Sequence, residues 1–187
     1  MACRNIANWK NLILSVNISP TQLSVLNFVP EIKKIAAAHG LPLSRLEIEI
    51  TERAVIRNAR AAKRVVDELH EEGAKVSLDD FGIGYASLGY LRELSFDKMK
   101  LDKSLTQSFA ESQSTRSIVE GTILIAKGLS VDIVAEGVET EDQARSMCLA
   151  GRSHLQGFYL RQPQSLQALE EMFPLRDSSV DGVDALS

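Results

Sequence analysis

The fold is decided by the stretch Ala74-Lys75-Val76-Ser77-Leu78-Asp79-Asp80-Phe81-Gly82, a short apolar strand that ends in two carboxylates and a glycine. The same arrangement recurs along the chain, where other short apolar segments carry or end near Asn17, Glu49, Lys100 and Glu136. Polar side chains at the ends of successive apolar strands are typical of a parallel barrel whose active site lies at the carboxyl ends of its strands. The sequence therefore predicts a barrel-like protein with a polar site at one end.

Strand and helix patterns alternate along the chain. The predicted strands lie near residues 12–17, 46–51, 75–79, 98–102, 131–135 and 154–158. Helical periodicity appears between them, and the predicted helices include 29–39, 54–72, 116–127, 141–150 and 166–172. Alternating strands and helices predict an α/β protein with a parallel sheet covered by helices. A closed barrel of this kind has eight strands, so this count predicts an incomplete, TIM-like (β/α) barrel.

Two predicted strands have one charged face and one apolar face. Glu47 and Glu49 alternate with leucine and isoleucine, and Lys98 and Lys100 alternate with methionine and leucine. This alternation favours a barrel with a polar interior over an open doubly wound sheet. No glycine-rich dinucleotide motif follows a predicted strand, which also argues against the doubly wound alternative. Glu47 and Lys98 could equally form an ordinary cross-strand pair.

Composition limits the classes of function. The chain has 187 residues, enough for one substantial core, and a formal net charge of -4. Without a basic block, it is not expected to bind duplex nucleic acid. No apolar run reaches the ~20 residues of a membrane span, and no signal-peptide pattern opens the chain. Cys3 and Cys148 lack metal-ligand spacing, so we expect reduced core thiols and a cytoplasmic protein.

The strand-end residues form a set of potential metal ligands. They offer only oxygen ligands: Asn17, Glu49, Asp79, Asp80, Glu136 and Glu139. Such a set suits a hard divalent cation such as Mg²⁺ or Mn²⁺. Zinc is disfavoured, because the three histidines are not paired at ligand spacing. On an extended backbone Asp79 and Asp80 would point to opposite sides, but at a strand end each could bind one of two metals, which together can activate water for displacement at phosphorus.

Six motifs occur in the order and near the spacing of a known family. They are Val16-Asn17-Ile18-Ser19, Glu49-Ile50-Thr51-Glu52, Asp79-Asp80-Phe81-Gly82-Ile83-Gly84-Tyr85, Lys100-Leu101-Asp102, Glu136-Gly137-Val138-Glu139 and Gln156-Gly157-Phe158. Over residues 2–163 they resemble the bacterial EAL domain, a family of cyclic-di-GMP phosphodiesterases. The resemblance implies an EAL-type barrel over residues 1–175 that hydrolyses cyclic-di-GMP to linear pGpG in bacterial second-messenger signalling. Residues 176–187 are polar and lack periodicity, and we expect a disordered tail there.

The resemblance also implies which residues hold the metals. Asn17, Glu49 and Asp79 would hold the first Mg²⁺ or Mn²⁺ ion. Asp79, Asp80 and Glu136 would hold the second. In one-metal versions of the mechanism, Glu136 would instead be the general base, so its role stays open.

Further roles and partners follow from the same resemblance. Lys100 would orient the attacking water and offset the charge that develops on the phosphoryl oxygens. Glu52 would brace the loop 81–85, and the helix after this loop would form a homodimer. Glu139 and Gln156 would line the substrate side of the site. Upstream sensory or GGDEF-type domains would regulate it.

The chain departs from the family at the motif that names it. Glu-Ala-Leu is absent, and Asp184-Ala185-Leu186 in the tail is a chance similarity. In the family this motif precedes Asn17, and its glutamate is a first-metal ligand. The resemblance therefore implies an N-terminally truncated domain that lacks this ligand and two early strands. Two alternatives stay open: a non-catalytic module that binds cyclic-di-GMP or a partner protein, and an aldolase barrel with Lys100 as the Schiff-base lysine.

Overall fold

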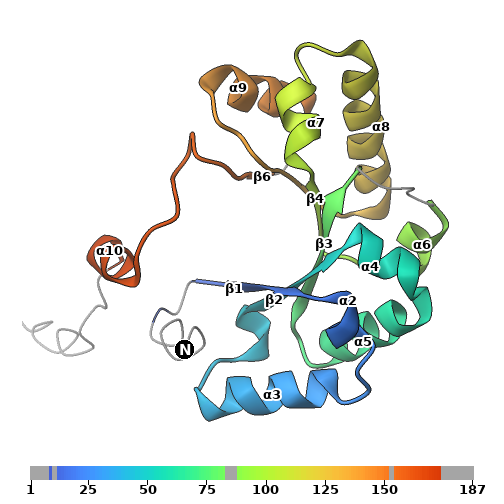
Figure 1. Cartoon of the computed structure of the whole chain (residues 1–187), viewed down its shortest axis with the longest axis vertical. Helices are drawn as coiled ribbons and strands as arrows, with labels where there is room; N and C mark the ends of the chain where they lie inside the picture. The colour runs from blue at the N-terminus through green and yellow to red at the C-terminus, as the bar shows by residue number, and fades with distance from the viewer. Residues whose placement is uncertain (1–8, 10–11, 83–87, 152–153, 174–187) are drawn as a thin grey trace, which may run out of the picture.

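The computed structural model describes residues 9, 12–82, 88–151 and 154–173. These residues form one parallel sheet whose six strands follow each other in chain order (Figure 1). The strands are β1 (Leu14–Ile18), β2 (Leu46–Thr51), β3 (Lys75–Phe81), β4 (Lys98–Leu101), β5 (Asp132–Ala135) and β6 (His154–Leu155). The predicted α/β class, the parallel sheet and the number of strands are confirmed. Among the described residues, β1 and β6 each pair with one neighbour, so the sheet is not closed.

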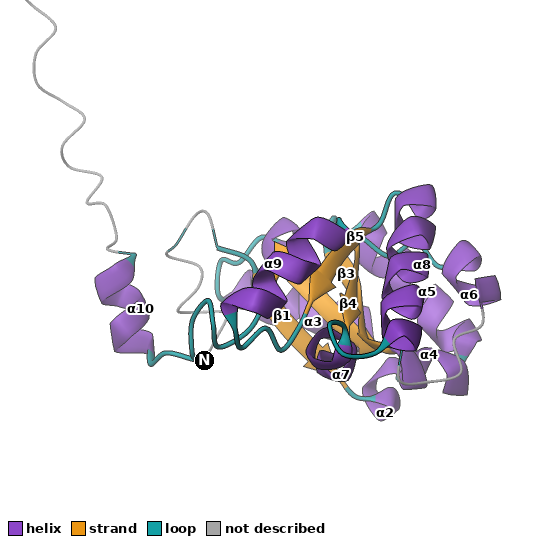
Figure 2. Cartoon of the chain, turned by 90° about the horizontal axis from the view of Figure 1, so that it is seen from above, coloured by secondary structure: helices purple, strands orange, loops and turns teal. Residues whose placement is uncertain are grey.

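Helices connect the strands and surround the sheet. They are α2 (Pro20–Leu23), α3 (Phe28–Ala38), the 3-10 turn η1 (Leu43–Arg45), α4 (Glu52–Arg57), α5 (Ala59–Glu71), α6 (Leu88–Glu93), α7 (Lys103–Ser108), α8 (Gln113–Leu129), α9 (Glu141–Ala150) and α10 (Leu166–Met172). In Figure 2 the strands lie at the centre with most helices around them, whereas α10 lies apart. The sheet and its helices thus have the curved form of a barrel that is open on one side.

Two helices differ from the prediction for local reasons. The single amphipathic stretch expected over 54–72 is divided into α4 and α5, because the side chain of Asn58 accepts a hydrogen bond from the Ala61 N–H and begins a new helix. The side chain of Asp102 likewise accepts from the Ser104 N–H and begins α7, which the sequence did not predict. The last predicted strand, 154–158, is shorter than expected, since β6 ends at Leu155.

The core lies between the sheet and the helices. Ile48 and Ile50 of β2 are fully buried in one apolar cluster with Val65, Val66 and Leu69 of α5. Burial of apolar surface is the main force that holds such layers together. The opposite face of the same strand carries glutamates, so the predicted division into an apolar outer face and a polar inner face is confirmed.

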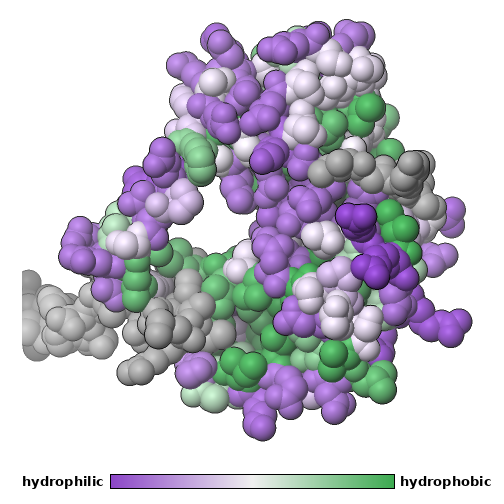
Figure 3. Space-filling model, viewed as in Figure 1, coloured by the Kyte–Doolittle hydropathy of each residue, from purple (hydrophilic) through white to green (hydrophobic). Residues whose placement is uncertain are grey.

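Apolar side chains are exposed on the open side of the sheet. Ile13, just before β1, is 44% exposed, and Phe158, Tyr159 and Leu160, just after β6, are 60%, 45% and 51% exposed. Figure 3 shows apolar side chains gathered around β1 in this view. Exposed apolar groups of this extent mark surfaces that another segment or molecule can cover. They agree with the prediction of an incomplete barrel.

Three further expectations have different outcomes. Cys148 is exposed on α9, so its assignment to the core is wrong; Cys3 lies outside the described residues. The tail 176–187 also lies outside them. Within the described part of the chain, no helix has the length and apolar character needed to cross a bilayer.

Candidate active site

A buried lysine joins the predicted strand-end residues. Lys100, at the end of β4, is 5% exposed. Its Nζ lies 2.7 Å from Glu136 Oε1, 3.1 Å from Glu49 Oε2 and 3.3 Å from Asp79 Oδ1. These carboxylates come from β2, from β3 and from the residue directly after β5, so the sheet brings groups distant in sequence to one point.

The backbone at the end of β3 places two adjacent carboxylates in the same site. Asp80 has a φ of 55°, in the left-handed region, and the β3–β4 register shifts between Leu78 and Phe81. Aspartate tolerates this conformation better than most residues. The irregularity overcomes the alternation that would point Asp79 and Asp80 to opposite sides. As a result, Asp79, Asp80 and Glu136 each offer an oxygen atom, and these atoms lie within 4.8 Å of one another.

The same three residues fit a hard cation. Oδ1 of Asp79 is buried and accepts no hydrogen bond from the described residues, although it lies 3.3 Å from the Lys100 ammonium. A buried carboxylate oxygen without a hydrogen bond is costly, and a bound cation would satisfy it. Oxygen ligands alone favour Mg²⁺, Mn²⁺ or Ca²⁺ over zinc. Asp79, Asp80 and Glu136 thus match the ligands predicted for the second metal.

Electrostatics support this interpretation. Asp80 is exposed at the surface, but partial desolvation raises its pKa, and the charges of Asp79 and Asp102 raise it further. Burial also raises the pKa of Glu136, against the opposing effect of its hydrogen bond with Lys100. Burial alone would lower the pKa of Lys100, but the surrounding carboxylates outweigh it and raise that pKa. The carboxylates therefore repel one another, and an added cation would relieve this repulsion.

Two of the three residues predicted for the first metal, Asn17 and Glu49, meet Lys100 at a single oxygen atom. Asn17 donates a hydrogen bond from Nδ2 to Glu49 Oε2 over 3.0 Å, and Lys100 donates to the same oxygen. Asn17 is exposed, whereas Glu49 is buried. The structure thus brings Glu49 and Asp79 into contact with Lys100 and holds Asn17 against Glu49. Asn17 and Glu49 are not part of the close acidic group.

Glu52 lies behind the site. Its side chain is 2% exposed and accepts hydrogen bonds from the Gly82 N–H over 3.1 Å and from the Tyr90 hydroxyl over 3.2 Å. It therefore connects the first turn of α4 to the residue after β3 and to α6. The rest of the predicted loop, residues 83–85, lies outside the described part of the chain.

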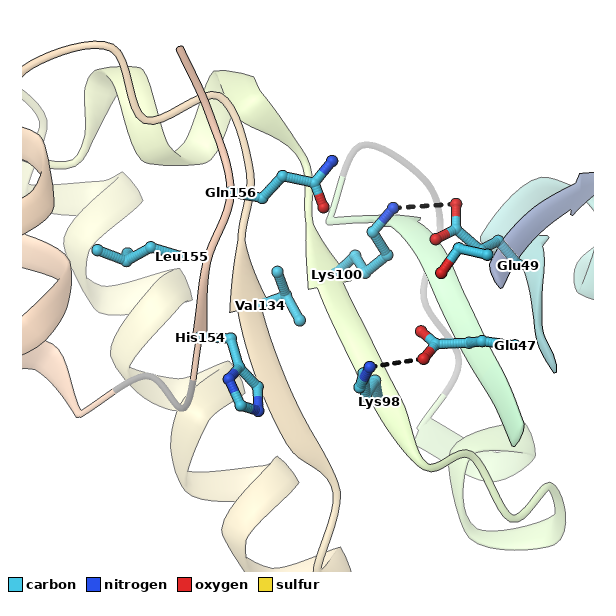
Figure 4. Close-up of a pocket in the computed structure, with 9 residues that line it drawn as sticks. Glu47, Glu49, Lys98, Lys100, Val134, His154, Leu155 and Gln156 are labelled. Carbon is cyan, nitrogen blue, oxygen red and sulfur yellow. Dashed lines mark hydrogen bonds and ion pairs between the residues drawn. The ribbon is translucent and has the colours of Figure 1, made fainter. Parts of the chain in front are cut away.

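The two predicted substrate residues have different surroundings. Gln156 lines a pocket of about 260 Å³ together with Glu49 and Lys100 (Figure 4). Glu139 is exposed, and its Oε1 accepts a hydrogen bond from Gln107 Nε2 over 3.4 Å. Gln156 therefore borders the lysine site, whereas Glu139 does not line this pocket.

The pocket also contains residues that the sequence analysis did not assign to a site. They are Ser15, Glu47, Lys98, Val134, His154 and Leu155. Five of the six lie two residues before a predicted site residue, which is either on the same strand or directly after it, and such residues share one face of the sheet. Strand periodicity could therefore have found these five once the sites at 17, 49, 100, 136 and 156 were named.

Comparisons with known proteins identify the family to which the chain is similar. The family model "EAL domain" matches residues 1–163. The cyclic di-GMP phosphodiesterase PA2567 of Pseudomonas aeruginosa is 34% identical over 174 residues, which are 91% of this chain and 30% of that protein. Like PA2567, the other curated relatives are much longer than the chain; it spans 22% of a protein from Synechocystis that is 36% identical over 152 residues.

Solved structures of similar fold contain the same kind of domain. The phosphodiesterase of MucR in complex with c-di-GMP matches 90% of this chain and 70% of its own, with a TM-score of 0.85 and 33% identity. A manganese and cy-diGMP complex of Klebsiella pneumoniae BlrP1 matches 84% of this chain and 41% of its own, with a TM-score of 0.78 and 29% identity. The family match, the similar structures and the arrangement of the strand-end residues lead to one conclusion: the chain belongs to the EAL domain family.

Proposed function

We propose that this chain carries the metal site of a cyclic-di-GMP phosphodiesterase, which hydrolyses one phosphodiester bond to give pGpG. One observation carries the proposal: Asp79, Asp80 and Glu136 form a close acidic group with an unsatisfied buried oxygen, directly beside Lys100. The similarity to PA2567, which is named a cyclic di-GMP phosphodiesterase, supplies the substrate. The manganese complex of BlrP1 supports Mn²⁺ as the cofactor, and ligand sets of oxygen atoms alone also suit Mg²⁺.

Two sets of residues would hold the two metal ions. Asp79, Asp80 and Glu136 would hold one ion and Asn17, Glu49 and Asp79 the other, in the two-metal arrangement that the family resemblance implies. When bound, the metals would lower the pKa of a water and stabilise charge on the phosphoryl oxygens.

Lys100 adds a fixed positive charge at the same place, where it would offset the negative charge that develops during attack. Glu136, whose pKa is raised by burial, is suited to accept a proton if it is free of metal. Gln156 would contact the substrate from the pocket side, and Glu139 from the loop after β5. Glu52 would act by holding Gly82 at the end of β3.

The environment of Lys100 opposes the aldolase alternative. A Schiff-base lysine must lose its proton, and enzymes achieve this by lowering the pKa of the amine. The carboxylates around Lys100 do the opposite and raise its pKa. The non-catalytic alternative keeps one supporting observation, the open side of the sheet between β1 and β6.

Location and assembly are also proposals. MucR is named a bifunctional diguanylate cyclase and cyclic di-GMP phosphodiesterase, which supports upstream GGDEF-type or sensory domains as partners. A cytoplasmic location fits this role. A homodimer through α6 rests on the family resemblance.

The decisive experiment measures conversion of cyclic-di-GMP to pGpG by chromatography, in Mn²⁺ and in Mg²⁺, with an EDTA control. Asp80→Asn removes one anionic ligand but keeps a residue type that tolerates a left-handed backbone. We expect it to lower turnover at least about tenfold. Asp67→Asn, on the exposed surface of α5, is the matched control and should match the unmodified chain. Tight nucleotide binding without turnover would favour the binding module, and equal turnover of Asp80→Asn would refute the metal assignment.

A further inference from the structure

A second ion pair lies beneath the lysine site. Lys98 Nζ lies 2.5 Å from Glu47 Oε2, and Glu47 is 2% exposed. Figure 4 shows this pair below the Lys100–Glu49 pair, with both lysines on β4 and both glutamates on β2. Each strand therefore contributes two charged residues, two positions apart, to the same face of the sheet.

Both ion pairs pass over the strand that separates β2 from β4. In the register of the sheet, Glu49 lies opposite Ser77 on β3, and Ser77 lies opposite Lys98 on β4. Glu47 lies opposite Lys75, so its pair with Lys98 crosses β3 on the side of Ser77 toward Lys75. The Lys100–Glu49 pair crosses on the side toward Asp79. Ser77 is thus the β3 residue between two parallel ion pairs.

The small size of Ser77 makes this arrangement possible. Ser77 is fully buried, and its hydroxyl has no hydrogen-bond partner among the described residues. A buried hydroxyl without a partner is unfavourable, so its presence is not explained by hydrogen bonding. A short side chain at this position leaves room for two lysines to reach across β3 to glutamates two strands away.

We propose that the Glu47–Lys98 pair and Ser77 position Lys100 in the active site. The pair fixes the separation of β2 and β4 one layer below the site, and this separation sets the reach of Lys100 to Glu49, Asp79 and Glu136. This inference rests on the proposed function for its consequence in turnover. Its structural part concerns the contacts between Lys100 and the ligand carboxylates, and it can be tested without measuring turnover.

An ordinary stabilising role makes a different prediction. A buried ion pair often adds little net stability, and apolar residues of similar size replace such pairs at little cost. The double variant Glu47→Leu/Lys98→Met should therefore stay folded. If the pair only stabilises the fold, its removal should leave the environment of Lys100 and the metal affinity unchanged. If the pair positions Lys100, its removal should alter both.

The experiment compares this double variant with a control double variant, Lys33→Met/Glu72→Leu, which removes an exposed ion pair of 2.6 Å between α3 and the residue after α5. The first readout is the NMR signal of the Lys100 side-chain ammonium in metal-free protein, which reports its carboxylate partners. The second is Mn²⁺ affinity by electron paramagnetic resonance, and the third is kcat. In the double variant we expect a displaced Lys100 signal and about a 10–100-fold loss in Mn²⁺ affinity and kcat, typical for residues that orient metal ligands. The control should change neither.

A second pair of variants keeps both charges. Ser77→Ala preserves the small side chain and should leave the Lys100 signal and Mn²⁺ affinity unchanged. Ser77→Val inserts bulk between the two ion pairs and should reproduce the effects of the double variant. These two variants decide the question if Glu47→Leu/Lys98→Met fails to fold.

Three results would separate this inference from the proposed function. The positioning role would be overturned, whatever the turnover, if two measurements stayed the same in both Glu47→Leu/Lys98→Met and Ser77→Val. These are the Lys100 signal and the Mn²⁺ affinity, the latter within about twofold. A displaced signal with no turnover in any form would support the positioning role and refute the proposed function. A change in kcat that is as large in Ser77→Ala as in Ser77→Val would also overturn the positioning role, because the size of the side chain would then not matter.

Discussion

Replacement of Lys100 by methionine tests whether its charge holds the site together. Methionine has a similar length, so the change removes the ammonium and leaves the packing nearly intact. Glu49, Asp79 and Glu136 would lose a cation that lies 3.1, 3.3 and 2.7 Å from their oxygens. Removal of one partner from a buried ion pair costs about 3–5 kcal/mol, because a buried charge stays uncompensated. For a chain of this size, each kcal/mol corresponds to roughly 2–4 °C in Tm, so we expect a loss of about 6–20 °C without metal.

The loss should depend on pH in a defined direction. The pKa values of Asp80 and Glu136 are already raised in the folded chain, and the loss of Lys100 would raise that of Glu136 further. An acid whose pKa is higher in the folded than in the unfolded state destabilises the fold at pH values above its folded pKa. This cost disappears as the pH falls below its unfolded pKa. Lys100→Met should therefore be most destabilised near neutral pH and approach the unmodified chain at acidic pH.

Urea unfolding followed by circular dichroism, at several pH values and in EDTA, measures this prediction. Lys63→Met is the control, since it breaks an exposed ion pair with Asp67 on α5 and should cost at most about 1 kcal/mol at any pH. Saturating Mn²⁺ should restore much of the stability of Lys100→Met, because a divalent ion would compensate the same carboxylates. A loss below about 1 kcal/mol, or one that is independent of pH, would refute the argument that Lys100 neutralises a buried acidic group.

Other features of the structure make further predictions. A Cβ atom on Gly157 would overlap the carbonyl oxygen of Val138, so Gly157→Ala should lower the free energy of unfolding by about 1–3 kcal/mol or more in thermal melts. Gly128→Ala meets no atom within 4 Å inside α8 and should be neutral or stabilising by up to about 1 kcal/mol; equal effects of the two would contradict the steric argument. Glu52→Gln, which removes the charge that accepts from the Gly82 N–H, should cost about 1–3 kcal/mol and weaken Mn²⁺ binding in calorimetry, and unchanged affinity would show that Glu52 acts on the fold alone. Mn²⁺ at about 100 times its Kd should stabilise the chain by about 2.7 kcal/mol, and EDTA should reverse the rise in Tm.

Much of the fold was predictable because its strands carry a clear alternation. Glu47 and Glu49 on one face of β2, and the buried Ile48 and Ile50 on the other, are enough to place that strand between a polar interior and the helices. The division of 54–72 into two helices was harder. Asn58 is compatible with a helix interior on pattern alone, and its role as a cap depends on its non-helical backbone, with φ of −153° and ψ of 71°.

The site was predictable as a set of residues but not as a geometry. Their position at the ends of predicted strands identified Asp79, Asp80 and Glu136 as site residues. Their convergence, however, depends on the left-handed backbone of Asp80 and on the register shift in β3. Neither follows from periodicity, because the register shift belongs to the pairing of β3 with β4 and the left-handed φ belongs to a single residue. The Glu47–Lys98 pair was named from the sequence as an ordinary cross-strand pair, but it spans β3, because β2 and β4 are not neighbours in the sheet.

The charges of the site also bear on the number of metal ions. Glu49, Asp79, Asp80 and Glu136 carry four negative charges when ionised, and Lys100 carries one positive charge, so the group has a net charge of −3. A phosphodiester is itself an anion of charge −1. With one divalent ion these five groups would keep a net charge of −1 and would repel the substrate, whereas with two they would reach +1, which the nearby Asp102 charge would reduce to about neutral. We therefore expect calorimetry to give one Mn²⁺ ion per chain in the absence of nucleotide, bound at the acidic group. In the presence of cyclic-di-GMP we expect two, because the negative charge of the phosphodiester favours binding of the second ion. A single ion in both conditions, together with full nucleotide affinity, would show that Lys100 and one metal suffice and would favour Glu136 as the general base.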